Sequence, residues 1–474
     1  MFINGEWLRT EKFFPVTDPA DGSVIAEVPD GGEKKIDQAI AAAFEAFDSW
    51  SKTTAYQRAG FLQKAHVLMM DNLEHLAQTM TQEQGKPIRA ARNEVRYGAD
   101  FLSWFAEEAK RVYGRTIPSA RADQRFMVMK QPMGVVGAVT PWNYPVSMIT
   151  RKLAPALAAG CTMVIKPAEA TPLCAIELFK LFEQAGLPKG VANLVTALDP
   201  RPVGEAFCTD PRVAKLTFTG STAVGRMLAS KAALQMKRVS LELGGHAPFI
   251  VCKDANPVMA AKGLSLVKFL NTGQACISPN RIFVHVSQKE AFLRELAAKV
   301  SAMKAGKGTE PGVGIGPLVN KAAVEKVDNQ VKDALDHGGT LIAGGKRLTD
   351  GGLDRGWFYA PTILDNVTEE MLIYSQETFG PVAPVITYED EEDLLRMAND
   401  TRYGLAAYVY TRDVANAFTM FEGLNFGIIG INDINPTSAA APFGGMKESG
   451  LGREGAAEGM DEYLETKLGG FSLR

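Results

Sequence analysis

Short apolar runs alternate with longer helix-like stretches in this chain, and no other feature restricts its fold as strongly. In the first half the apolar runs lie at 134–139, 162–165 and 213–218, and the helix-like stretches lie at 147–159, 171–186 and 222–235. A strand followed by a helix and then by another strand predicts a parallel sheet with helices on both faces.

The same alternation begins again after residue 244. Strand candidates follow at 249–251, 281–285, 382–387, 408–410 and 427–429, and helix candidates at 288–304, 319–337, 390–399 and 413–423. Since 474 residues exceed what one hydrophobic core normally holds, we predict an α/β fold with two open-sheet domains. The glycine-rich run Gly312–Gly316 is expected to be a loop.

Segments outside these two domains complete the predicted architecture. Residues 33–50 and 56–84 carry apolar side chains at helical spacing. Residues 114–132 are polar at first and then alternate, which is typical of an arm that leaves the body, and 461–474 has the pattern of a late strand. Both are candidates for contacts between subunits. We therefore expect a small β arm and a homodimer or homotetramer.

Composition and the chain's start exclude several classes of function. A net charge of −3 argues against nucleic acid or an anionic membrane as the main partner. No apolar run reaches the roughly 18 residues of a transmembrane helix. The start predicts a hairpin with an Asn4–Gly5 turn in place of a secretory signal. Five scattered cysteines and five histidines match neither a disulfide framework nor a zinc site. We expect a cytoplasmic protein without a metal.

A glutamate and a cysteine, each near glycines, are candidates for joint catalysis. Glu242 interrupts the apolar, strand-like run Val239–Leu243, which two glycines follow, and Cys276 ends the segment Asn271–Cys276 in a predicted turn. A thiol attacks only as a thiolate and needs a lowered pKa or a base. Burial would raise the pKa of a carboxylate toward that of a useful base. Locally, a buried loop cysteine and a solvent-facing carboxylate on an edge strand fit equally well.

Polar residues follow the ends of two predicted strands. Asn143 lies in Pro141–Pro145 after the first strand, where its amide is placed to donate to a developing oxyanion. Lys166 and Glu169 follow the next strand, where a carboxylate suits ribose hydroxyls and would repel a 2′-phosphate. A turn asparagine and two solvated charges are the local alternatives.

Two further turns bring chemistry-bearing residues to the end of a strand. Phe218–Gly225 is a junction of strand, glycine loop and helix, whose backbone N–H groups can face a pyrophosphate. It lacks the three glycines of the usual dinucleotide fingerprint. Glu377–Pro381 places a carboxylate and an aromatic ring in one turn before a strand. A turn with one buried anchor is the alternative for this second segment.

Taken in order, these motifs resemble the aldehyde dehydrogenase superfamily over essentially the whole chain. The matching segments are Pro141–Asn143, Lys166–Glu169, Phe218–Ser221, Leu241–Gly245, Gly273–Cys276, Glu377–Pro381, Pro442–Gly445 and Ser449–Glu454. So many motifs in one order do not coincide by chance, and the resemblance therefore outweighs the local alternatives.

The resemblance implies a fold with two open-sheet α/β domains and a small β oligomerisation arm. An NAD-binding domain is implied for 1–110 and 133–243, and a catalytic domain for 244–445. Residues 111–132 and 455–474 are the implied oligomerisation and bridging segments.

The resemblance also implies a role for each motif residue. Cys276 is the implied nucleophile, Glu242 the base and Asn143 the oxyanion donor. The implied contacts to NAD are Trp142, Lys166, Glu169, Gly220, Ser221, Leu243, Glu377 and Phe379. The implied reaction oxidises a small aldehyde to a carboxylic acid through a Cys276 thioester, which water activated by Glu242 then hydrolyses.

Within the superfamily the chain most resembles succinate-semialdehyde dehydrogenases. The segments that carry this likeness are Met148–Lys152, Gly244–Val251 and Glu377–Pro381. It implies that Arg151 holds a substrate carboxylate and that Ser438 matches a serine of the C-terminal loop.

Two departures from that group bear on the substrate and on redox control. Relatives carry a second carboxylate-binding arginine six positions before the nucleophile, where Leu270 stands here. Relatives often carry a second cysteine at the position of Ser278, so no disulfide switch is expected there. The missing arginine removes a charge-assisted contact. A longer, larger or less acidic aliphatic or aromatic aldehyde thus stays open beside succinate semialdehyde.

Two rival functions also stay open. A CoA-acylating semialdehyde dehydrogenase is disfavoured by Glu242, which would promote attack by water. A non-catalytic binding paralogue is disfavoured because Cys276, Glu242 and Asn143 are all present.

Overall fold

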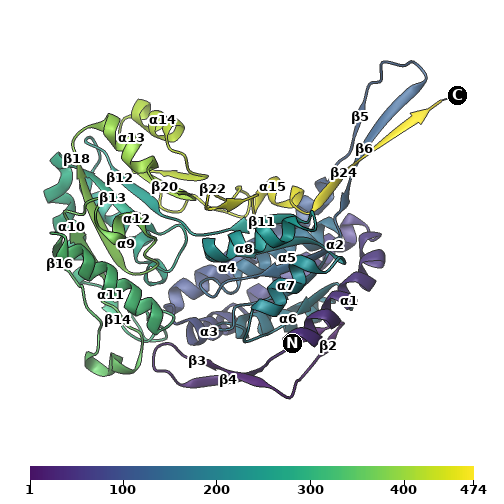
Figure 1. The fold of residues 1–474 in the computed structure, drawn as a ribbon, viewed down its shortest axis with the longest axis horizontal. Coiled ribbons are helices and arrows are strands. Elements are labelled where there is room, and N and C mark those ends of the chain that lie inside the picture. The colour runs from purple at the N-terminus through teal and green to yellow at the C-terminus, as the bar shows by residue number, and fades with distance from the viewer. Residues whose placement is uncertain (474) are drawn as a thin grey trace.

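The computed structural model describes residues 1–473, and Figure 1 shows two lobes, each built on its own sheet. The sheet of the first lobe has eight strands in the order β2 (Glu6–Trp7), β1 (Phe2–Ile3), β9 (Ala192–Leu194), β8 (Thr162–Lys166), β7 (Val135–Val139), β10 (Val213–Thr219), β11 (Arg238–Glu242) and β23 (Gly450–Leu451). The five central strands from β9 to β11 are parallel, as the alternation predicts.

Helices cover both faces of this first sheet. They are α1 (Gly32–Ser51), α2 (Ala55–Asp71), α3 (Leu73–Gln84), α4 (Ile88–Glu108), α5 (Ser147–Ala159), α6 (Leu173–Ala185), α7 (Arg201–Thr209) and α8 (Thr222–Ala233), with a 3₁₀ turn at Ala109–Arg111. Neighbouring residues of β7 point to opposite faces. Val135 packs in a core with α1, α7 and α8, whereas Val136 packs with residues of α2 to α6. The predicted two-sided layering is therefore confirmed.

The second lobe repeats this plan with a seven-stranded sheet. Its order is β16 (Thr340–Ala343), β17 (Thr362–Asp365), β18 (Val382–Tyr388), β13 (Pro279–His285), β12 (Ala247–Val251), β20 (Ala406–Tyr410) and β21 (Ile428–Ile431), with only β16 antiparallel to its neighbour. Its helices are α9 (Pro257–Lys268), α10 (Lys289–Ser301), α11 (Lys321–Asp336), α12 (Leu372–Ser375), α13 (Glu391–Asn399) and α14 (Val414–Gly423), with 3₁₀ turns at Leu270–Gly273, Val286–Gln288 and Asp350–Arg355. The predicted second α/β domain is confirmed.

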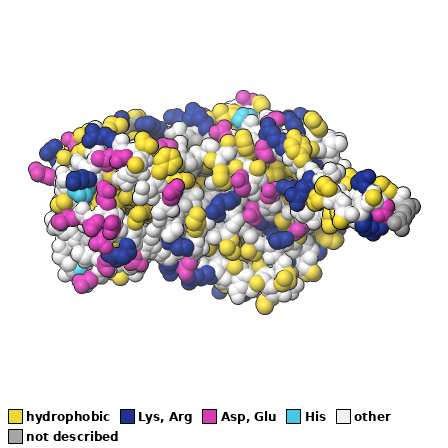
Figure 2. Space-filling view, turned by 90° about the horizontal axis from the view of Figure 1, so that it is seen from above, with side chains coloured by type: hydrophobic (Ala, Val, Ile, Leu, Met, Phe, Trp, Pro, Cys, Tyr) yellow, Lys and Arg dark blue, Asp and Glu magenta, His cyan; other side chains and the backbone are white. Residues whose placement is uncertain are grey.

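A three-stranded arm projects from the first lobe and carries the C-terminal end of the chain (Figure 1). It consists of β5 (Arg115–Ile117), β6 (Gln124–Pro132) and β24 (Leu464–Ser472), and β24 pairs antiparallel with β6 along its full length. The predicted arm and late strand are thus confirmed, while Arg474 lies outside the described residues. Met127 and Met129 are more than half exposed, and Figure 2 shows apolar side chains on the projecting arm.

Shorter elements join these bodies. They are the hairpin of β3 (Phe13–Thr17) and β4 (Val24–Pro29), the pair β14 (Lys304–Ala305) with β15 (Val313–Ile315), the pair β19 (Tyr403–Gly404) with β22 (Met446–Lys447), and helix α15 (Ala456–Asp461). In Figure 2 acidic and basic side chains are interspersed over the face shown. Within residues 1–473 no helix is long and apolar enough to cross a membrane.

Two local predictions are wrong. The expected single helix 56–84 is divided at Asn72, whose side-chain amide donates to the carbonyl of Leu68 at 2.8 Å and competes with the helical hydrogen bonds. The expected loop Gly312–Gly316 contains the short strand β15, because pairing with β14 supplies hydrogen bonds that local sequence cannot reveal. Helix α4 was also missed, although Ala91, Val95 and Leu102 are buried at helical spacing.

Candidate active site

The turn that carries Cys276 is held in an unusual backbone conformation. Asn271, Thr272 and Gly273 have φ values of 50°, 58° and 75°, in the left-handed region. A Cβ on Gly273 would lie 2.1 Å from the carbonyl oxygen of Gly380, so glycine is required there. Such strain persists only where surrounding contacts determine it. Here the Thr272 hydroxyl bonds to both main-chain groups of Gly316, at 3.1 and 3.0 Å.

All five cysteines are unpaired, and Cys276 differs from the other four because it is half-buried while they are buried. Burial, and then the charge of Glu242, raise the pKa of its thiol to about 12, whereas the Arg151 charge lowers it. A thiol with this pKa is protonated at neutral pH. Attack by Cys276 therefore requires a nearby group that takes its proton.

Glu242 is the last residue of β11 and is buried, at 4% exposure. Strands β10 and β23 flank β11 on both sides, so the solvent-facing alternative is excluded. Burial and the charge of Glu454 raise the pKa of Glu242 well above its ordinary value, against the opposing charges of Arg151 and Lys152. Within residues 1–473 its Oε2 atom has no hydrogen-bond partner. A carboxyl group with a raised pKa is suited to accept and return protons near neutral pH.

Asn143 is brought against the nucleophile turn from the first lobe. Its side-chain Nδ2 donates to the carbonyl of Gln274 at 3.1 Å, two residues before Cys276. Its own carbonyl accepts from Lys86 Nζ at 2.8 Å and from Asn271 Nδ2 at 3.0 Å. The structure thus places the Asn143 side chain against the turn that precedes Cys276.

Arg151 lies on α5 in a buried cluster of charges. Its guanidinium is 2.8 Å from a carboxylate oxygen of Glu454 and stacks 3.9 Å from the ring centroid of Phe443. Lys152 reaches the other oxygen of Glu454 at 2.5 Å. Sequence reasoning missed Lys152 and Glu454, although both stand inside quoted motifs. Only the folded structure reveals the cluster, because Lys152 and Glu454 are in contact there although 302 positions separate them in the sequence.

The two remaining substrate-side residues lie at the surface. Ser438 is exposed on a loop, where its carbonyl accepts from the N–H of Ala441. Leu270 is 41% exposed at the start of the 3₁₀ turn before Cys276.

Three predicted cofactor residues lie at or after the ends of β8 and β10. Lys166 is buried and pairs at 2.8 Å with Glu169, which is 43% exposed. Ser221 caps α8 by accepting from the N–H of Val224 at 3.4 Å, and its side chain is exposed. Because β8 and β10 flank β7 in a parallel arrangement, the Glu169 carboxylate and the N-terminus of α8 stand at the same edge of the sheet, which fits a ribose diol joined to a pyrophosphate.

Neighbouring backbone fixes this edge of the sheet. The N–H of Gly220 donates to the carbonyl of Glu242 at 3.0 Å. Leu243 is buried, and a Cβ on Gly225 of α8 would lie 2.3 Å from its Cδ2. The glycine at position 225 therefore allows α8 to approach the strand that ends in Glu242.

The second lobe contributes Glu377 and Phe379. Glu377 accepts from the N–H of Gly245 at 2.9 Å, and burial raises its pKa. Phe379 has a φ of 56° and meets Trp142 of the first lobe edge-on, with ring centroids 5.6 Å apart. The two motifs, far apart in the sequence, thus face each other across the lobes.

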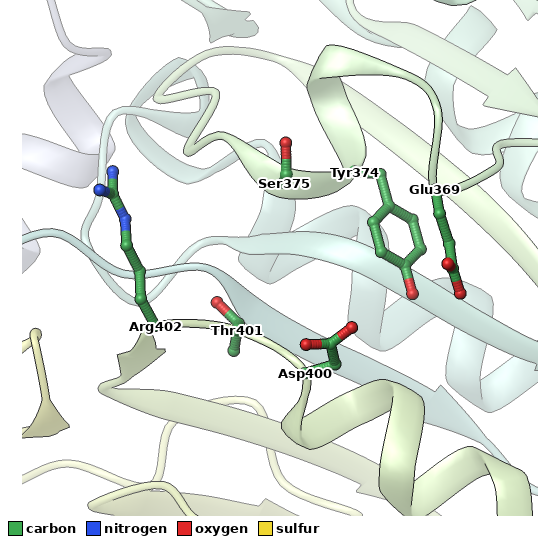
Figure 3. A pocket seen from close by; sticks show the side chains of 6 residues that line it. All are labelled: Glu369, Tyr374, Ser375, Asp400, Thr401 and Arg402. Carbon is green, nitrogen blue, oxygen red and sulfur yellow. The ribbon is translucent and has the colours of Figure 1, made fainter.

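A surface pocket of about 380 Å³ lies elsewhere on the second lobe. It is lined by Glu369, Tyr374, Ser375, Asp400, Thr401 and Arg402. Figure 3 shows Tyr374, Glu369 and Asp400 at one end and the Arg402 guanidinium at the other. None of these residues belongs to the predicted site, so pocket size does not identify the reacting centre here. Within residues 1–473 no group of three or more His, Cys, Asp or Glu side chains is placed to hold a metal ion.

Comparisons with known proteins identify the family of this chain. The model of the aldehyde dehydrogenase family matches residues 7–468. A mitochondrial succinate-semialdehyde dehydrogenase of Arabidopsis thaliana is 48% identical over 98% of this chain and 88% of its own length. A 3-sulfolactaldehyde dehydrogenase of Pseudomonas putida is 46% identical over 99% and 96%. The crystal structure of an E. coli NADP-dependent enzyme superposes with a TM-score of 0.97 at 46% identity, over 100% of this chain and 98% of that one. The chain therefore belongs to the aldehyde dehydrogenase family, whose members use NAD or NADP, and is an oxidoreductase that acts on small aldehydes.

Proposed function

We propose that this enzyme oxidises an anionic aldehyde to its carboxylic acid through a thioester on Cys276, with NAD as its cofactor. The observation that carries the proposal is the bond from Asn143 Nδ2 to the Gln274 carbonyl. It supports placing an amide donor at the turn of the nucleophile, whose thiol feels the charge of Glu242.

Cys276 and Glu242 act in successive halves of the proposed reaction. The Cys276 thiol loses its proton to solvent, and Sγ then forms a bond to the aldehyde carbon. Asn143 Nδ2 and the Cys276 N–H hold the oxyanion, and removal of one such donor typically costs about 10²–10³ in rate. Loss of hydride from this adduct leaves the thioester. Glu242 then takes a proton from water as the water oxygen bonds to the thioester carbon. The C–S bond breaks, Glu242 returns the proton to Sγ, and the acid leaves with the thiol restored.

When bound, NAD supplies the acceptor for the hydride. Lys166, Glu169, Gly220, Ser221, Leu243, Trp142, Glu377 and Phe379 are the residues that would hold it. The exposed Glu169 carboxylate supports NAD over NADP, because a 2′-phosphate would lie against like charge. Lys166 pairs with this carboxylate at 2.8 Å, and the Glu169 side chain is still 43% exposed.

The charges near Cys276 support an anionic substrate. Arg151 and Lys152 are two cations that share the single carboxylate of Glu454. Although burial opposes it, the charges of Lys152 and Arg151 lower the pKa of Glu454, so one ionised carboxylate stands against two cations. A carboxylate such as that of succinate semialdehyde, or a sulfonate, would be attracted. Succinate-semialdehyde and 3-sulfolactaldehyde dehydrogenases are both among the relatives. Arg151 and Ser438 are the proposed contacts.

Leu270 favours a second candidate, a dehydrogenase for a less acidic aliphatic or aromatic aldehyde. It presents an exposed apolar side chain, at 41%, close in sequence to the nucleophile. Measurement of kcat/KM for succinic and glutaric semialdehydes and for aliphatic and aromatic aldehydes separates the two candidates. Preference for the neutral compounds by tenfold or more, on the order of 1.4 kcal/mol, would reverse our assignment.

The Glu242→Gln variant tests the thioester. The hydride step should persist as a burst of NADH, while steady turnover stalls at hydrolysis, and Cys276→Ala should show neither. Equal loss of burst and turnover in Glu242→Gln would remove Glu242 from the hydrolytic step. Restoration of turnover by CoA would instead indicate a CoA-acylating enzyme, and absence of NADH with every aldehyde would indicate a binding paralogue.

The domain roles follow the same proposal. Residues 1–110 and 133–243 form the NAD-binding domain and 244–445 the catalytic domain. Residues 111–132 and 455–474 make subunit contacts in a homodimer or homotetramer, which light scattering would identify. Five unpaired cysteines support a reducing compartment, the cytoplasm.

A further inference from the structure

Lys86 is a buried lysine that touches the proposed oxyanion donor from behind. It lies between α3 and α4, is 1% exposed, and donates to the Asn143 carbonyl at 2.8 Å. Its Nζ also forms an ion pair with Glu94 of α4 and lies 4.1 Å above the ring of Tyr144. None of the sequence motifs includes Lys86 or Glu94.

Glu94 extends the same contact to the helix that follows Asn143. Its Oε1 accepts from the N–H groups of Val146 and Ser147, at 3.0 and 3.2 Å, where α5 begins. Lys86 and Glu94 together therefore hold the main chain on both sides of Tyr144 and Pro145. Because a buried ion pair contributes little net stability compared with apolar packing, stability alone does not account for this pair.

The Lys86 segment is also docked on the loop that supports the nucleophile turn. The N–H of Ile88 donates to the carbonyl of Gly308 at 2.9 Å. The carbonyl of Gly85 lies 2.2 Å from where a Cβ on Gly316 would stand. Gly316 is the residue that holds Thr272 in the turn before Cys276. Through these contacts Lys86 connects the Asn143 carbonyl to the support of Cys276.

We propose that Lys86, with Glu94 as its counter-ion, is a positioning residue that sets the orientation of the Asn143 amide toward the oxyanion. The inference rests on the proposed function, since it presumes that Asn143 is the oxyanion donor. A displacement of about 1 Å in such a group can cost on the order of 100-fold in rate. Removal of Lys86 should thus slow steps that form an oxyanion and spare steps that do not.

Two cofactor-free reactions of Cys276 make this distinction. With 4-nitrophenyl acetate, Sγ bonds to the ester carbon through an oxyanion and 4-nitrophenolate leaves. With iodoacetamide, Sγ displaces iodide and no oxyanion forms. We expect Lys86→Met to slow acylation by about 10- to 100-fold and to leave alkylation within about twofold. Glu94→Gln, which keeps an acceptor for the α5 amides, should act in the same direction.

Arg58 provides a matched control, because it is another buried cation that donates to a main-chain carbonyl, that of Ala158 at the far end of α5. Arg58→Met should leave both rates unchanged in folded enzyme. In an Asn143→Ala background, Lys86→Met should slow acylation no further, since the group it positions is gone.

The outcomes separate the inference from the function on which it rests. Wild-type acylation by Asn143→Ala would overturn both. If Asn143→Ala is acylated slowly while Lys86→Met and Glu94→Gln are acylated at the wild-type rate, only the inference about Lys86 is overturned. If Lys86→Met slows acylation and alkylation equally, Lys86 gives only general structural support and the inference is overturned. The same conclusion follows if Lys86→Met slows acylation further in the Asn143→Ala background.

Discussion

Gly245 offers the sharpest test of where Cys276 sits. A Cβ at this position would lie 2.2 Å from the carbonyl oxygen of Cys276 and 3.3 Å from its carbonyl carbon. Real Cβ contacts essentially never fall below 3.0 Å, so Gly245→Ala forces the two main-chain segments apart by about 0.8 Å. Neither segment can yield by rotating a side chain, because the close contact is with backbone.

The expected consequence is a slower first turnover. A shift of about 1 Å at a reacting group can cost on the order of 100-fold, and overpacking costs about 1–3 kcal/mol of stability. The assay is the stopped-flow burst of NADH at saturating aldehyde and NAD, measured below the onset of thermal unfolding. Gly314→Ala is the matched control, since a Cβ at Gly314 meets nothing within 4 Å. A Gly245→Ala enzyme that is folded and bursts at the wild-type rate would refute this placement.

Further predictions concern cofactor choice and the thiol. Glu169→Ser removes the carboxylate that opposes a 2′-phosphate. It should therefore raise kcat/KM for NADP relative to kcat/KM for NAD by about tenfold or more, on the order of 1.4 kcal/mol. Comparable kcat/KM values for both cofactors in the wild-type enzyme would contradict the reasoning. The raised pKa of Cys276, about 12, means that its iodoacetamide alkylation should still accelerate with pH above pH 10, because ionisation continues there. A plateau near pH 9 would contradict it. Arg151→Met should shift that profile to still higher pH, since the Arg151 charge lowers the Cys276 pKa. The same variant should lose more kcat/KM for anionic than for neutral aldehydes, and equal losses would count against Arg151 as a substrate contact.

Much of the fold was accessible from local pattern. The stretch 147–159 is α5 with the predicted bounds, and the apolar run 213–218 lies within β10. These predictions succeed because a buried strand or an amphipathic helix leaves its period in the order of its own side chains. The predictions at Asn72 and Gly312–Gly316 failed where a side-chain hydrogen bond or a distant strand decided the conformation.

The candidate site divides in the same way. Motif order alone pointed to Cys276, Glu242 and Asn143, and the structure places Asn143 against the Cys276 turn. Nothing in the order of residues indicated that Lys86 and Glu94 lie behind Asn143. Their contact follows from the packing of α4 against α5, which no local period encodes.

The sequence by itself therefore determined the two α/β lobes, the family motifs and the choice of Cys276 as the candidate nucleophile. Only the tertiary structure decided the electrostatics of the site. The pKa of the Cys276 thiol depends on burial and on Glu242 and Arg151, which the fold brings near from other elements. Glu454 likewise meets Lys152 across 302 positions. Charges act through space in a low-dielectric interior. Their effect is set by the folded arrangement of the chain, whereas side-chain periodicity is a property of neighbours along it.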